Sequence, residues 1–147
     1  MDKYGIRILV DDDEKGMRDL LLFELSSCGY EVMTAADGVE AHERAREKKF
    51  QLVICDLMMP KMNGMATLLA VKQLEPRTQF AMMTGFGTMQ IAVSAFKNGA
   101  YDFIQKPFHV KVLLITIEKA LKIQSGQIDQ QMEVESNGQP KKDFGCG

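Results

Sequence analysis

The stretch that decides the fold runs from Leu52 to Gly64 and reads LVICDLMMPKMNG. Its first four residues are apolar throughout, which is typical of a short strand buried on both faces of a parallel sheet. An aspartate, Asp56, follows this strand directly, and Asn63-Gly64 is typical of the start of a helix. The stretch therefore predicts a strand, a loop that begins with a carboxylate, and a helix.

The same alternation extends to both sides of this stretch. Short apolar runs recur, each followed by a segment with helical spacing, and five such pairs predict an α/β sandwich with right-handed crossovers. Asp37-Gly38 is expected to open the second helix, and Asn98-Gly99 is expected to end the fourth. The expected strands span residues 6–10, 30–34, 52–55, 79–84 and 101–104.

Composition limits the domain count and the classes of partner. The chain has 147 residues, of which 46% are hydrophobic and 26% are charged, with a formal net charge of −2. This length favours one domain. The near-neutral balance gives no electrostatic reason to expect binding to nucleic acid or to an anionic membrane surface. No apolar run approaches the roughly 18–20 residues of a membrane span.

The two ends of the chain differ from its middle. The N-terminal stretch meets acidic residues after a very short apolar run, which is unlike a secretory signal. The three cysteines are odd in number and widely spaced, with no CxxC, so the expected location is a reducing cytoplasm. Residues 1–124 are expected to form the folded domain. Residues 125–147 are polar and rich in glutamine and glycine, which is typical of a helix extension, a linker or a flexible tail.

Four polar features follow the predicted strands. An acidic run, Asp11–Glu14, follows the first strand, and Asp56 follows the third. Thr84 ends the fourth strand, and Lys106-Pro107 follows the fifth. The carboxyl ends of parallel strands share one edge of a sheet, and ligands bind at that edge in open α/β folds. We therefore expect these side chains to meet in space.

The residue types at this edge suit phosphoryl chemistry. Carboxylates from two strand ends form a hard oxygen site of the kind that Mg²⁺ prefers. A hydroxyl and an ammonium opposite them suit a transferring phosphoryl group, whose charge spreads over its oxygens. One carboxylate can then act as the nucleophile and form an aspartyl phosphate. Each feature alone is more typical of a helix cap or a turn, so only the combination indicates this chemistry.

Three segments resemble the receiver domain of bacterial two-component response regulators. They read ILVDDDEKGMRDLL, CDLMMPKMNGM and MMTGFGTMQIAVSAFKNGAYDFIQKPF, and the resemblance covers about residues 5–124. The last segment most resembles receivers of the nitrogen-regulator class of transcriptional activators. The resemblance implies a flavodoxin-like, doubly wound sheet of five parallel strands in the order 2-1-3-4-5, with five helices.

The resemblance also implies a role for each residue of the cluster. Asp56 would be the phosphoacceptor, and Thr84 and Lys106 would contact the phosphoryl oxygens. Pro107 would place Lys106 through a peptide bond that is expected to be cis, and Phe103 would be the aromatic switch residue. Mg²⁺ would be held by Asp13 directly, by Asp12 largely through water, by Asp56, and by the backbone carbonyl of Met58.

The implied mechanism is a switch. A phosphoryl group on Asp56 would draw Thr84 toward it, and Phe103 would fill the space that Thr84 leaves. The face formed by the fourth helix, fifth strand and fifth helix would then repack. The implied partners are a sensor histidine kinase or a phosphotransfer protein, a second copy of the chain through that face, and a C-terminal output domain. No membrane partner and no direct binding to nucleic acid by this chain are expected.

The metal-binding pair has two possible assignments, because three aspartates stand in a row. Glu14 and Arg18 favour Asp12 with Asp13, whereas a shift of one residue makes the pair Asp11 with Asp12. In the first case Asp11 fills a slot that usually holds an apolar residue. It would then lie near an edge, pair with a basic group, or be protonated, because burying an unpaired carboxylate is costly.

The activity also has alternatives. The expected protein is a signalling module that assists only its own phosphorylation and dephosphorylation. One alternative is an Mg²⁺-dependent aspartyl-phosphate phosphohydrolase, but such enzymes generally need a second aspartate close after the nucleophile, and Leu57-Met58 offers none. The other alternative is a pseudo-receiver that only binds proteins, which the presence of every expected site residue disfavours.

Overall fold

Five strands alternate with five helices in the computed structural model, which describes residues 5–58, 63–85 and 89–126. Each expected strand is present, and its bounds differ from the predicted ones by at most one residue. The strands are β1 (Arg7–Asp11), β2 (Glu31–Ala35), β3 (Leu52–Asp56), β4 (Gln79–Thr84) and β5 (Asp102–Gln105). The helices are α1 (Lys15–Ser27), α2 (Gly38–Glu47), α3 (Gly64–Leu74), α4 (Met89–Lys97) and α5 (Val110–Gln124).

The strands form one parallel sheet in the order β2-β1-β3-β4-β5, which confirms the flavodoxin-like fold. The chain moves outward from β1 to β2 and then returns to β3 on the other side of β1, so the order reverses between β1 and β3. In folds of this kind the ligand crevice lies outside the carboxyl ends of the strands at that reversal. The register brings the two ends together, because Asp11 pairs with Cys55, one residue before the end of β3.

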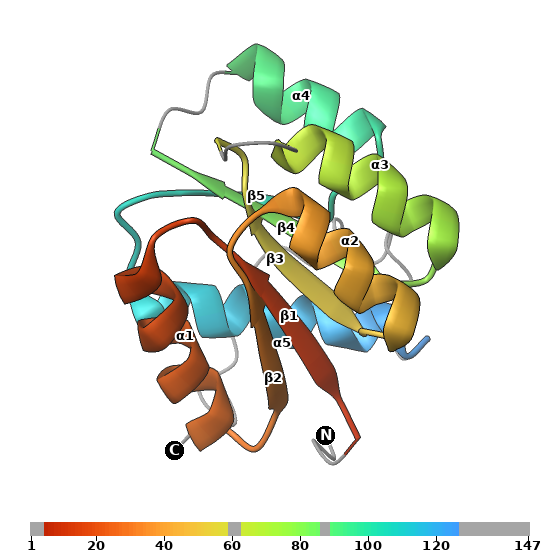
Figure 1. Ribbon diagram of the computed structural model, residues 1–147. Coiled ribbons are helices and arrows are strands. Elements are labelled where there is room, and N and C mark those ends of the chain that lie inside the picture. The colour runs from red at the N-terminus through yellow and green to blue at the C-terminus, as the bar shows by residue number, and fades with distance from the viewer. Residues whose placement is uncertain (1–4, 59–62, 86–88, 127–147) are drawn as a thin grey trace.

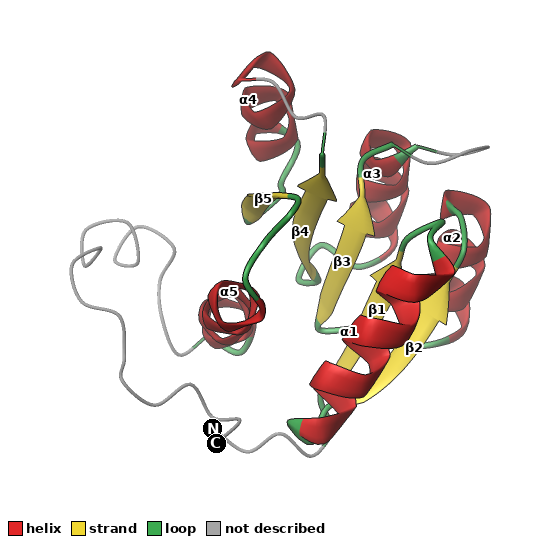
Figure 2. Ribbon diagram, turned by 90° about the vertical axis from the view of Figure 1, so that its left-hand side faces the viewer, coloured by secondary structure: helices red, strands yellow, loops and turns green. Residues whose placement is uncertain are grey.

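Helices cover both faces of the sheet, α1 and α5 on one face and α2, α3 and α4 on the other (Figures 1 and 2). Successive strand side chains point to opposite faces, so β1 sends Ile8 and Val10 toward α1 and α5 and sends Leu9 toward α2 and α3. All five residues of β3 are buried. This double burial explains why the central strands read as continuous apolar runs.

The predicted starts of α2 and α3 and the predicted end of α4 are confirmed. The Asp37 carboxylate accepts a hydrogen bond from the Glu40 N–H and begins α2, and the Asn63 side chain accepts one from the Ala66 N–H and begins α3. Such caps satisfy N–H groups that have no partner within the helix, at about 1 kcal/mol each. Gly99, at φ 104°, follows the end of α4 in a left-handed conformation that favours glycine.

The expected tail, residues 125–147, lies outside the described residues from position 127 onward. Helix α5 ends at Gln124. In the described part of the chain, no helix combines the length and the apolar character that crossing a membrane requires.

Candidate functional site

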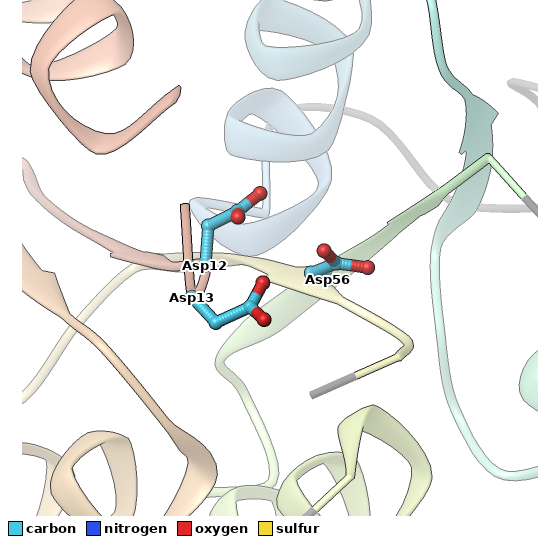
Figure 3. A group of neighbouring side chains, drawn as sticks. All are labelled: Asp12, Asp13 and Asp56. Atoms are coloured by element: carbon cyan, nitrogen blue, oxygen red, sulfur yellow. The ribbon is translucent and has the colours of Figure 1, made fainter. Parts of the chain in front are cut away.

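Three carboxylates meet at the carboxyl edge of the sheet, as the sequence predicted. Asp12 and Asp13 directly follow β1, and Asp56 ends β3 (Figure 3). One oxygen atom from each side chain lies within 4.8 Å of the others. Asp12 and Asp56 are buried, whereas Asp13 is exposed. The cluster is therefore held from inside the sheet and open to solvent on one side.

The ammonium group of Lys106 lies between the two buried carboxylates. Its Nζ donates hydrogen bonds to Asp12 Oδ2 at 2.7 Å and to Asp56 Oδ2 at 3.1 Å, and lies 3.7 Å from Glu14 Oε1. The Lys106-Pro107 peptide bond is cis, as expected from the sequence. The backbone N–H of Lys106 donates to the Thr84 carbonyl at 2.9 Å, which joins the end of β5 to the end of β4.

The backbone around the nucleophile candidate fixes its carboxylate. The Met58 N–H donates to Asp56 Oδ1 at 3.1 Å, and the Leu57 N–H donates to the Met83 carbonyl at 2.7 Å. One carboxylate oxygen of Asp56 thus accepts from the backbone and the other from Lys106. The side chain of Met58 is largely exposed beside the cluster.

Electrostatics at the cluster follow from burial and from Lys106. Burial raises the pKa of Asp56, and the nearby Asp12 adds to this, while the hydrogen bonds from Met58 and Lys106 oppose it. Burial also disfavours the charged form of Lys106, but the two carboxylates outweigh it, so the pKa of Lys106 is raised. Lys106 is therefore a cation at neutral pH.

Gly64 lets the start of α3 approach the strand that carries Asp56. A Cβ atom at this position would lie 2.7 Å from Leu57 Cα and 2.8 Å from the Asp56 carbonyl oxygen. The Gly64 N–H also donates to the Leu57 carbonyl at 2.9 Å. Asn63-Gly64 was predicted only as a helix start, and its close contact with the β3 backbone was not predicted.

The remaining candidates lie on the neighbouring strands. Thr84 is fully buried at the end of β4 and pairs with Gln105 in the sheet. Phe103, on β5, is half-buried and packs against the core layer under α2, α3 and α4. The structure thus puts Thr84 at the site edge and Phe103 further from it on the neighbouring strand, while their roles stay predictions.

Asp11 lies apart from the cluster, although it adjoins Asp12 in sequence. The Cys55 thiol donates to Asp11 Oδ2 at 3.4 Å, and Asp11 Oδ1 has no hydrogen-bond partner in the described part of the chain. Burial, opposed by the Cys55 hydrogen bond, raises the pKa of Asp11 to about 7. Of the two possible pairs, the structure brings Asp12 and Asp13 to Asp56. Of the three expectations for Asp11, the raised pKa favours the protonated form below pH 7.

Arg18 also contacts the site, although the sequence predicted no role for it there. Arg18 Nη1 donates to the backbone carbonyl of Asp12 at 2.8 Å. In the sequence Arg18 serves only to decide which aspartates form the pair. Its position four residues after Glu14, on the first turn of a helix that follows the acidic run, was the available signal.

The donor set fits a hard divalent cation. Carboxylate oxygens from Asp12, Asp13 and Asp56 are the ligand type that Mg²⁺ prefers, and the exposed side of the cluster leaves room for water and phosphate oxygens. An ammonium group at hydrogen-bond distance from the acceptor carboxylate suits an incoming phosphoryl group. The carboxylates thus suit a cation, and the ammonium group suits a phosphoryl oxygen.

This fold and this cluster define a class of signalling domain. The family model for the response regulator receiver domain matches residues 8–118. The chain belongs to this family, the receiver domains of two-component response regulators.

Two relatives of known name are similar to this chain over most of its length. The transcriptional regulatory protein ZraR of Escherichia coli K12 is 41% identical over 117 residues, which are 80% of this chain and 26% of ZraR. The chemotaxis protein CheY of Thermotoga maritima is 34% identical over 119 residues, which are 80% of this chain and 99% of CheY. The chain thus spans about a quarter of the length of ZraR.

Solved structures agree with these relatives. NtrX from Brucella abortus is 35% identical, with a TM-score of 0.77 over 89% of this chain and 30% of that protein. The beryllofluoride-activated NtrC4 receiver domain dimer is also 35% identical, with a TM-score of 0.77 over 80% of this chain and 98% of that domain. The predicted similarity to receivers of the nitrogen-regulator class is confirmed.

Proposed function

We propose that this chain is a phosphoacceptor: it takes a phosphoryl group from the phosphohistidine of a histidine kinase or phosphotransfer protein onto Asp56. The observation that carries the proposal is the convergence of three carboxylates with the Lys106 ammonium, which lies 3.1 Å from Asp56 Oδ2. A carboxylate in this setting is close to the groups that neutralise an incoming phosphoryl group. The family, to which the chain belongs, consists of signalling domains.

The metal proposed for this site is Mg²⁺. The residues that would hold it are Asp12, Asp13, Asp56 and the backbone carbonyl of Met58. When bound, the ion supplies positive charge that lowers the repulsion between the acceptor carboxylate and the phosphoryl oxygens. Lys106 contributes charge of the same sign through its contact with Asp56 Oδ2.

The transfer step is a displacement at phosphorus. A carboxylate oxygen of Asp56 forms a bond to phosphorus while the bond from phosphorus to the donor's imidazole nitrogen breaks. The imidazole leaves with that electron pair and is neutral, because its second nitrogen carries a proton. The Lys106 ammonium, already shared between Asp12 and Asp56, can then contact a phosphoryl oxygen.

The conformational consequence proposed is a packing switch. The phosphoryl group adds acceptor oxygens near the end of β4, where the Thr84 hydroxyl can donate to one of them. Thr84 is fully buried, so its movement frees space inside the fold that the half-buried ring of Phe103, on the adjacent strand, can fill. The face formed by α4, β5 and α5 would repack and shift an existing equilibrium between two states.

The domain organisation and partners belong to the same proposal. We infer a receiver domain over residues 1–124 and an extension or linker over residues 125–147, followed by an output domain. This rests on ZraR, a transcriptional regulatory protein about four times as long as the matched region, and on NtrX. The beryllofluoride-activated NtrC4 receiver domain forms a dimer, which supports homodimer formation here. We propose that phosphorylation drives this dimer and that the α4, β5 and α5 face forms it, because that face is the one proposed to repack.

The direct test is phosphorylation by a small donor. The protein is incubated with acetyl phosphate and Mg²⁺, and its intact mass is measured. We expect an adduct of one phosphoryl group per chain that forms with Mg²⁺ and is lost with EDTA or in Asp56→Asn. The matched control is Asp19→Asn, which removes an exposed aspartate of α1 outside the cluster and is expected to keep the adduct.

Two results would contradict the proposal. Absence of an adduct together with absence of Mg²⁺ binding would leave a pseudo-receiver as the better description. Sustained release of phosphate from varied phosphate monoesters would instead support the phosphohydrolase.

A further inference from the structure

Arg18 reaches from α1 to the backbone of the metal-site turn. The side-chain Nη1 of Arg18 donates to the Asp12 carbonyl oxygen at 2.8 Å. The backbone N–H of Arg18 donates to the Glu14 carbonyl at 3.1 Å within the first turn of α1. The guanidinium therefore extends from the first turn of α1 back to the junction between β1 and α1. The side chain is half-buried.

Asp12 is held at each of its polar atoms. Its N–H donates to the Ala35 carbonyl at 3.1 Å, and its Oδ1 accepts from the Glu14 N–H at 2.9 Å. Its Oδ2 accepts from Lys106, and its carbonyl accepts from Arg18. The Asp12 side chain thus has partners that do not depend on Arg18.

The Asp13 side chain, unlike that of Asp12, has no partner among the described residues. This side chain is exposed, and within residues 5–58, 63–85 and 89–126 no hydrogen bond or ion pair fixes its carboxylate. The carbonyl that Arg18 contacts belongs to the peptide unit that joins Asp12 to Asp13. Because a peptide unit is planar, holding that oxygen fixes the plane and the position of the Asp13 Cα. The point from which the Asp13 side chain extends therefore depends on Arg18 through the backbone.

We propose that Arg18 is a positioning residue for the metal site: by holding the Asp12–Asp13 peptide unit, it aims the Asp13 carboxylate toward Asp12 and Asp56. This inference rests on the proposed function, because it concerns the Mg²⁺ site of that function. Two other roles make different predictions. A cation acting only through its charge would repel Mg²⁺, so its removal would tighten binding. A residue acting only on helix stability would change unfolding and leave Mg²⁺ binding unchanged.

The test measures Mg²⁺ binding by isothermal titration calorimetry in the wild type and in Arg18→Met. Methionine keeps the helix propensity and the aliphatic stem but donates no hydrogen bond. We expect its dissociation constant for Mg²⁺ to rise about tenfold, the effect typical of groups that orient metal ligands. Arg18→Lys, which can donate one hydrogen bond to the carbonyl, is expected to lie between the two.

The matched control is Lys15→Met, which removes a positive charge from the same helix. Lys15 is largely exposed and pairs with Asp19 at 2.8 Å, away from the cluster. We expect this variant to bind Mg²⁺ as tightly as the wild type or slightly more tightly. Thermal unfolding of all variants in EDTA measures stability without the metal, and if Arg18→Met does not fold, Arg18→Lys carries the comparison.

A second measurement separates affinity from chemistry. The rate of labelling by acetyl phosphate is measured against Mg²⁺ concentration. For Arg18→Met, the half-saturating Mg²⁺ concentration is expected to rise about tenfold, with the rate at saturation within about twofold of the wild type.

The outcomes distinguish the two proposals. If the wild type binds Mg²⁺ and Arg18→Met binds it equally well or more tightly, the positioning role is refuted and the proposed function stands. If the wild type binds no Mg²⁺, the proposed metal site is refuted and this inference with it.

Discussion

Replacing Asp11 by valine is expected to stabilise the folded chain, and to do so more at pH 8 than at pH 5. Asp11 lies in the central part of the sheet, between β2 and β3, and is fully buried. Within the described residues its Oδ1 has no hydrogen-bond partner, and its Oδ2 accepts only the weak donor of Cys55 at 3.4 Å. Valine has a similar size and a high preference for strands.

The size of the effect follows from the pKa. Burial raises the pKa of Asp11 from 3.8 to about 7. The folded state therefore binds this proton more tightly than the unfolded state. The free energy of unfolding falls as the pH rises from the unfolded-state pKa of 3.8 to the folded-state pKa of about 7. At about 1.36 kcal/mol per pH unit, the shift corresponds to a penalty of about 4 kcal/mol above pH 7. About two pH units separate pH 5 from the folded-state pKa of about 7. The gain from Asp11→Val should therefore be about 3 kcal/mol larger at pH 8 than at pH 5.

The assay is urea unfolding of wild type and Asp11→Val at pH 5 and pH 8, in EDTA so that metal binding does not contribute. Asp19→Asn, which removes an exposed carboxylate, serves as the control and is expected to change the free energy of unfolding by no more than about 0.5 kcal/mol at either pH. A gain from Asp11→Val that is the same at both pH values would refute the reasoning, because it would mean that Asp11 does not titrate in this range.

Three further predictions concern the site. Gly64→Ala is expected to destabilise the fold by about 1–3 kcal/mol in thermal unfolding, because the new Cβ would lie 2.7 Å from Leu57 Cα; Gly16→Ala, which meets nothing within 4 Å, should instead be neutral or stabilising. Lys106→Met is expected to cost about 3 kcal/mol in urea unfolding at pH 8 in EDTA, because it leaves two buried carboxylates without their cation; a loss as large at pH 4 would contradict this reason. Thr84→Ala is expected to keep the phosphoryl adduct in intact mass but to lose phosphorylation-dependent dimer formation in analytical ultracentrifugation, and an unimpaired dimer would exclude the proposed switch role.

Much of the fold could be predicted from local pattern. In β3 every residue is buried, so its apolar run is continuous and easy to find. The start of α3 was also clear, because Asn63 is a residue type that caps helices and it does accept from the Ala66 N–H. These features depend on residues close in sequence, which is why reading along the chain finds them.

The members of the candidate site were predicted because parallel topology brings strand ends to one edge. Asp12, Asp13 and Asp56 do meet there, and Lys106 reaches two of them. Their proposed roles in phosphoryl transfer stay predictions until the acetyl phosphate experiment is done. Topology alone could not say which oxygen atoms come together or what else contacts them.

The sequence by itself determined the alternation of strands and helices along the chain, the α/β class of the fold and the side chains available at the sheet edge, because these follow from periodicity and from residue types at strand ends. Only the tertiary structure decided three further points. Among the described residues, Asp11 lies beside Cys55 and has no cation as a partner. Arg18 contacts the Asp12 carbonyl, and Gly64 lies against the β3 backbone. Each depends on how close two backbones or side chains approach across packed elements, and that distance is set by the packing of the whole domain.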